Sequence, residues 1–140
     1  MALTEAARNF NWLLSHFVEE TAGVSGAVAV SSDGLLIARS RSLDPRGGEQ
    51  LCALIAGCAS MAQAIDRLLE RDGVERVIVA MQRGFLFVCS IADGSCLGVV
   101  ATRDCDVGSV GYQATELVAK VGEILTPALR EELKARAGSA

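Results

Sequence analysis

The chain has 140 residues, of which 51% are hydrophobic and only 4% aromatic, and its formal net charge is −4. No uninterrupted apolar run approaches the ~18 residues of a membrane-spanning helix; the longest is Leu51–Ala59, so we expect no direct membrane insertion. Scattered basic residues and few aromatics argue against nucleic-acid binding as the main activity.

The length suits a single domain spanning residues 1–140, with a core over about 8–134 and a frayed tail at 135–140. An apolar fraction this high in one domain predicts a partner surface, most simply with a second copy of the chain. No signal peptide is evident, which favours a cytoplasmic protein with reduced thiols. The cysteines are odd in number and form no Cys-x-x-Cys pair: Cys52, Cys58, Cys89, Cys96 and Cys105.

The first predicted element is a helix that ends near Glu20. Its apolar residues recur at the spacing of a surface helix: Phe10, Leu13, Leu14, Phe17 and Val18. Gly23 ends this helix. The strands Val24–Ser31 and Leu35–Arg41 follow and, joined by a tight turn, form a hairpin.

A long helix from about Glu49 to Arg71 comes next. We expect one apolar stripe of this helix to pack on the chain's own sheet: Leu51, Leu54, Ile55, Cys58, Ala62, Ile65, Leu68 and Leu69. The other side carries small residues in place of a polar face: Ala53, Ala56, Gly57, Ser60 and Ala64. A helix that is apolar nearly all round is buried on more than one side. The small side is therefore predicted to pack on the same helix of a second subunit, the alternative being a central helix in a monomer.

Three strands and a final helix complete the chain. The strands are Val74–Met81, Phe85–Ile91 and Cys96–Thr102, joined by hairpin turns. The second strand is apolar on both faces, which predicts a central strand with helices on both sides. A helix begins near Val107, breaks at Thr126–Pro127 and continues briefly to Leu133.

These elements predict an α/β fold, a three-layer α/β/α sandwich with a five-stranded antiparallel sheet. The order along the chain is helix, strand, strand, helix, strand, strand, strand, helix.

The sequence contains no pattern typical of an active site. Neither a P-loop nor a dinucleotide-binding glycine motif is present. His16 is the only histidine, so neither a zinc site nor a His-activated nucleophile is expected. We expect His16 to be half-buried in the first helix, and the aspartates to close turns. The prediction is a binding module without cofactor or metal, and not an enzyme.

Several stretches resemble the Roadblock (dynein light chain) family, and more narrowly its short actinobacterial members that accompany a Ras-like GTPase. They are Asn11–Leu14 with Phe17–Glu20, Val30–Leu36, Arg83–Val88, Val110–Tyr112 and Val121–Arg130. Together they extend over about residues 8–134. These stretches are typical of the fold and carry no catalytic pattern.

The resemblance implies a homodimer in which the central helices pack together and the strands after them pair into a ten-stranded sheet. The implied interface residues are Ala53, Leu54, Ala56, Gly57, Ser60, Ala64, Val77 and Val79. It also implies that the dimer binds a Ras-like small GTPase, which in the Mgl-type bacterial pair is activated without an inserted arginine. The candidate GTPase-facing residues are Arg46, Glu49, Gln50, Gln63, Arg67 and Arg71.

Two other functions stay open at this point. A related α/β module could sense a small ligand bound between sheet and helix, which would require a cavity there. A weakly active thiol enzyme would require a reactive cysteine. Activation and scaffolding of the GTPase are both compatible with this pattern, and a membrane sensor-kinase complex is a further candidate partner that would recruit the dimer.

Overall fold

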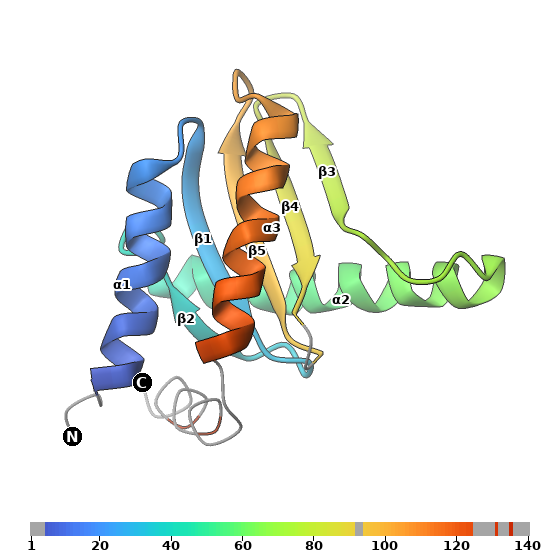
Figure 1. Ribbon diagram of the computed structural model, residues 1–140, viewed down its shortest axis with the longest axis horizontal. Helices are drawn as coiled ribbons and strands as arrows, with labels where there is room; N and C mark the ends of the chain where they lie inside the picture. The colour runs from blue at the N-terminus through green and yellow to red at the C-terminus, as the bar shows by residue number, and fades with distance from the viewer. Residues whose placement is uncertain (1–4, 92–93, 125–130, 132–134, 136–140) are drawn as a thin grey trace.

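Figure 1 shows a computed structural model that describes residues 5–91, 94–124, 131 and 135. Its elements follow the predicted order. They are α1 (Glu5–Glu20), β1 (Val24–Val30), β2 (Leu36–Arg39), α2 (Pro45–Leu69), β3 (Val77–Met81), β4 (Gly84–Ser90), β5 (Cys96–Thr102) and α3 (Val107–Ile124).

The five strands form one antiparallel sheet in the order β2-β1-β5-β4-β3. Helices α1 and α3 cover one face and α2 the other (Figure 1). Alternate residues of β4 accordingly enter opposite cores: Phe87 packs with α1 and α3, and Val88 packs on the side of α2. The predicted sandwich is thus confirmed. The expectation that β4 is an inner strand covered on both faces is also confirmed, since it lies between β5 and β3.

Helix α2 differs from the prediction at both ends. It begins at Pro45, four residues before the predicted Glu49, because proline suits the first helical turn, where an N–H has no partner in the helix. It ends at Leu69, where Glu70 adopts a left-handed conformation and donates its N–H to the Asp66 carbonyl. The predicted break at Thr126–Pro127 lies outside the described residues.

Glycine at position 98 of β5 allows α2 to approach the sheet. A Cβ at Gly98 would overlap the Cδ1 atom of Ile55, whose side chain is fully buried there. Along α2 the buried residues are only Gly48, Cys52 and Ile55. The fully buried residues of α2 therefore all lie in its N-terminal half.

The C-terminal half of α2 extends past β3, the last strand of the sheet, as Figure 1 shows. The prediction that the whole apolar stripe packs on the chain's own sheet is wrong for this half. Ile65, Leu68 and Leu69 are exposed. The reason is geometric, since beyond β3 the chain has no sheet of its own to cover them.

Candidate protein-binding surface

Seven of the ten large hydrophobic side chains that are exposed on the described chain belong to α2 and β3. Met61 is 69% exposed and Leu68 is 82% exposed, unusual values for such side chains at the middle and end of a long helix. We call this set of residues the α2–β3 surface. It comprises Leu54, Met61, Ile65, Leu68 and Leu69 of α2 with Ile78 and Met81 of β3. Apolar patches of this kind mark sites of protein association.

The predicted interface residues lie on or beside this surface. Ala53, Leu54, Gly57, Ser60 and Ala64 are exposed, and Ala56, Val77 and Val79 are partly exposed. At Gly57 an added Cβ would meet no atom within 4 Å. The small residues therefore leave an open helix face that another chain could approach closely.

Strand β3 adds a free sheet edge to the surface. It pairs with β4 on one side, in register from Val77 opposite Val88 to Met81 opposite Gly84, and lies at the end of the sheet. Beside it, a hollow of about 340 Å³ separates β3 from the overhanging helix, lined mainly by Ala62, Ile65, Leu69, Val74 and Val77. An apolar edge strand next to an apolar helix is a template for pairing with another chain.

Arg76, directly before β3, links the start of this strand to α3. Its Nη2 atom lies 3.1 Å from Glu75 Oε1 and 3.3 Å from Thr115 Oγ1 of α3. The guanidinium lies against Gly111, where any Cβ would overlap Nη1. The sequence patterns did not single out this residue, although glycine at a buried helical position is a signal of such close approach.

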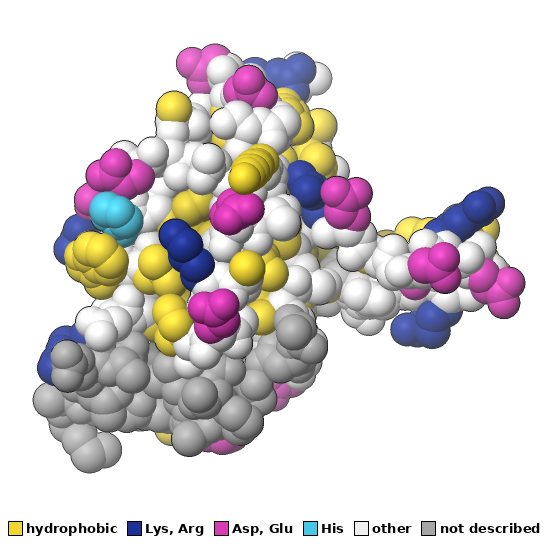
Figure 2. Space-filling view, viewed as in Figure 1, with side chains coloured by type: hydrophobic (Ala, Val, Ile, Leu, Met, Phe, Trp, Pro, Cys, Tyr) yellow, Lys and Arg dark blue, Asp and Glu magenta, His cyan; other side chains and the backbone are white. Residues whose placement is uncertain are grey.

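The candidate GTPase-facing residues fall into two groups at opposite ends of α2. Arg46, Glu49 and Gln50 are exposed near its start. Arg67 and Arg71 are exposed near its end, and Gln63 is partly buried. Arg46 and Arg67 are about 32 Å apart along the helix axis at 1.5 Å per residue. One chain therefore does not bring the two groups together. Figure 2 shows the charged side chains of both signs at the far end of the helix.

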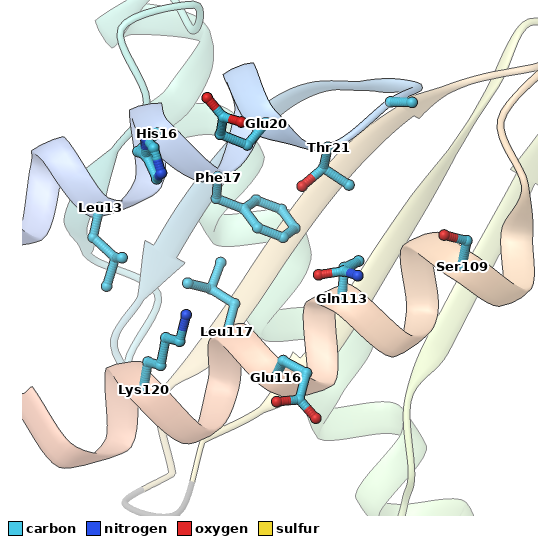
Figure 3. A pocket seen from close by; sticks show the side chains of 11 residues that line it. Leu13, His16, Phe17, Glu20, Thr21, Ser109, Gln113, Glu116, Leu117 and Lys120 are labelled. Carbon is cyan, nitrogen blue, oxygen red and sulfur yellow. The ribbon is translucent and has the colours of Figure 1, made fainter.

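A groove on the opposite face of the sheet separates α1 from α3 (Figure 3). It encloses about 290 Å³, with Leu13, Phe17 and Leu117 among its lining and Lys120 and Glu116 on the α3 side. His16 lies at its α1 wall and stacks on Trp12, with 4.7 Å between the ring centroids. The expectation of a half-buried His16 is wrong, because its ring packs on an exposed indole instead of the core.

A second cavity, of about 370 Å³, lies between α2 and the ends of the strands. Ser31, Ser60, Gln63 and Ser90 are among the polar residues that line it, together with small apolar ones. None of the lining residues that the structure describes is charged. This is the place, between sheet and helix, where a ligand-sensing module would hold a small neutral molecule.

The buried thiols are poor nucleophiles. Burial, with a smaller contribution from the nearby Glu49 carboxylate, raises the pKa of Cys52 to about 11. Burial also raises the pKa of Cys89, although Arg76 partly opposes this. Because the thiolate is the reactive form, both cysteines are inert near neutral pH. Over the described residues no cluster of three or more His, Cys, Asp or Glu side chains could hold a metal ion.

The raised pKa of Cys52 predicts a stability loss at alkaline pH. The unfolded chain ionises this thiol near pH 9, whereas the folded chain does so only near pH 11. The free energy of unfolding should therefore fall between pH 9 and 11, by on the order of 2 kcal/mol for this group. Urea unfolding of the wild type and Cys52→Ala across that range should show a flatter profile for the variant. Parallel profiles would contradict the assignment.

By length and composition α2 could cross a membrane; it is the one helix within the described ranges that meets this criterion. Its uncharged stretch, residues 50–65, spans about 24 Å at the helical rise, short of the ~30 Å hydrocarbon core. Cys52 and Ile55 from this stretch are fully buried against the sheet. The apolar character of α2 is therefore also explained by packing on the sheet and on a protein partner.

Comparison with known proteins identifies the fold family. The Roadblock/LC7 domain model matches residues 10–101, about two thirds of the chain. The chain belongs to the Roadblock/LC7 family. The crystal structure of a Roadblock/LC7 domain from Streptomyces avermitilis is 32% identical, with a TM-score of 0.75, covering 79% of this chain and 92% of that one. No curated protein shows a significant match to this Roadblock/LC7 chain.

More distant structures share the fold. MglB of Myxococcus xanthus is 14% identical, with a TM-score of 0.75, and the alignment covers 89% of this chain and 92% of that one. The gliding protein MglB of Thermus thermophilus is 19% identical, with a TM-score of 0.76, covering 89% and 93%. At these identities the likeness establishes the Roadblock/LC7 architecture.

Proposed function

We propose that this Roadblock/LC7 protein is a homodimeric, non-enzymatic regulator or scaffold of a Ras-like small GTPase. It acts in the cytoplasm, and a membrane sensor-kinase complex is the partner that would recruit it to the membrane. The observation that carries the proposal is the α2–β3 surface, a long apolar helix that overhangs a free sheet edge. The family supplies the class of partner.

The geometry of the overhang favours a second copy of the chain as the first partner. Pairing of two β3 strands across a two-fold axis would continue the sheet from five to ten strands. The C-terminal half of each α2 would then cover the sheet of the other chain, which buries Ile65, Leu68 and Leu69. The same contact satisfies the main-chain groups of the free edge.

The same two-fold arrangement unites the candidate GTPase-facing residues. Antiparallel packing of two α2 helices places the start of one beside the end of the other. Arg46, Glu49 and Gln50 of one chain then lie near the copies of Arg67 and Arg71, forming one polar surface from two distant groups. A surface of this kind suits a protein partner because Arg is favoured at interfaces. No arginine of the chain needs to enter the GTPase site.

The test is capture of the GTPase from native cell lysate by tagged protein, with GDP or a non-hydrolysable GTP analogue added. We expect mass spectrometry to identify a Ras-like GTPase that is enriched with the GTP analogue, and a hydrolysis assay with the purified pair then measures activation. Equal recovery with both nucleotides would indicate a scaffold. Absence of any GTPase from both samples would contradict the proposal.

The cavity between α2 and the strand ends favours one alternative, a small-ligand sensor. Its lining is uncharged over the described residues and includes Ser60 and Gln63, which suits a small neutral polar molecule. A sensor predicts that a ligand from a metabolite library raises the melting temperature of the protein. The GTPase-regulator function predicts no such ligand, so a thermal-shift screen separates the two.

A further inference from the structure

The two edges of the sheet differ in how their main-chain groups are satisfied. At the β2 edge, Ala38 and Ser40 turn toward β1, and the Ser40 N–H donates to the Ala27 carbonyl at 2.9 Å. Because neighbouring strand residues alternate, the N–H groups of Arg39 and Arg41 point outward, away from the sheet. These outward groups are where another strand would pair.

Side-chain acceptors of helix α1 bind these outward N–H groups. The Arg39 N–H donates to Asn11 Oδ1 at 3.2 Å, and the Arg41 N–H donates to Ser15 Oγ at 3.0 Å. One turn further along α1, Glu19 Oε1 accepts from the Arg41 guanidinium at 2.8 Å. Ser15 is only 4% exposed, so its hydrogen bond is shielded from water.

The fit between helix and strand follows from their repeats. Asn11, Ser15 and Glu19 are four residues apart, which spaces them about 6.0 Å along a helix. Alternate residues of a strand are about 6.7 Å apart. Asn11 and Ser15 of α1 therefore present two acceptors at nearly the interval of the two outward N–H groups, as a neighbouring strand would.

Strand β3, at the other edge, has no comparable cover. Among the described residues, its only main-chain partner is β4. Its exposed side chains are apolar, whereas the β2 edge is covered by a helix, a device by which proteins protect sheet edges. The chain is thus closed at one edge and open at the other.

We infer that Asn11 and Ser15 close the β2 edge against a further copy of this chain, so that edge-to-edge assembly stops at two copies. A chain with two open edges could pair at both and would grow without limit. Removal of the two acceptors breaks the main-chain hydrogen bonds that hold α1 against β2, so that the helix can move aside and leave the edge to another copy. The limit of two copies rests on the proposed function, whereas the closure of the β2 edge rests on the hydrogen bonds alone.

The experiment compares the wild type with the double variant Asn11→Ala/Ser15→Ala by sedimentation at increasing protein concentration. Alanine is the best helix former, so the changes remove the acceptors without weakening α1 as a helix. We expect the wild type to stay at the mass of two chains and the variant to grow beyond it with concentration. Hydrogen exchange should show faster exchange of the Arg39 and Arg41 amides in the variant.

Two control variants separate edge closure from a general loss of structure. Asn11→Asp/Ser15→Thr keeps both acceptors and should retain the wild-type mass. Glu19→Ala removes only an exposed ion pair, which contributes little, and should also retain it. A double alanine variant with unchanged circular dichroism and wild-type mass at all concentrations would overturn the inference.

The mass of the wild type tests the proposed dimer, and the mass of the double variant tests the closure of the β2 edge. A monomeric wild type would contradict the proposed dimer, but the inference would then still predict that the double variant forms pairs through β2. A dimeric wild type with a dimeric double variant would contradict the inference and leave the proposed dimer intact.

Discussion

Met61→Arg is expected to convert a species of twice 14.6 kDa into a folded monomer. Met61 lies midway along the apolar face of α2 and is 69% exposed in the single chain, so arginine meets no obstacle there. In the dimer the substitution would place an unpaired charge from each chain within an apolar contact. Removing such a charge from water costs several kcal/mol, which corresponds to an increase in the dimer Kd of about 100-fold or more.

The measurement is light scattering coupled to size exclusion, with circular dichroism to show that the fold is kept. Gly57→Arg provides a second variant at the same face, since no atom lies near the added side chain and glycine is itself a poor helix residue. Ala119→Arg, an exposed position on α3, is the matched control and should leave the mass unchanged. A Met61→Arg protein that keeps the mass of two chains would exclude α2 as the dimer contact.

The order of elements could be predicted because local patterns determine it. The apolar residues of α1 recur at helical spacing, and β4 is apolar on both faces because both faces are covered. The predicted start of β3 at Val74 is three residues before the observed start at Val77, because valine favours strands wherever it occurs. Pairing with β4 decides where the strand begins, and this pairing is not a local property.

The site was only partly predictable for a related reason. The small face with Ala53 and Gly57 signals close approach in the sequence itself, and the structure leaves it exposed. The sequence pattern does not single out Met61, and it assigns Ile65 and Leu68 to the chain's own core. All three depend on where α2 crosses the sheet relative to its edge. Periodicity tells which residues share a face, but not whether that face has a sheet beneath it.

Arg67→Glu is expected to abolish nucleotide-dependent capture of the GTPase while the mass of two chains is retained. Arg67 is exposed near the end of α2, and the two-fold symmetry of the proposed dimer would place it beside the polar start of the other helix. A reversal replaces attraction by repulsion at an interface where charge selects the partner. We expect a loss of captured GTPase of about 10-fold or more, since one charge reversal of this kind costs more than ~1.4 kcal/mol.

Lys120→Glu makes the same charge change on the opposite face of the sheet, beside the groove between α1 and α3. It should leave capture unchanged if the GTPase binds over α2. The two variants together decide which face carries the partner, because both sites are accessible in the proposed dimer. Loss of capture by Lys120→Glu with normal capture by Arg67→Glu would show that the GTPase binds at the groove between α1 and α3. The polar ends of α2 would then act only in the contact between the two chains.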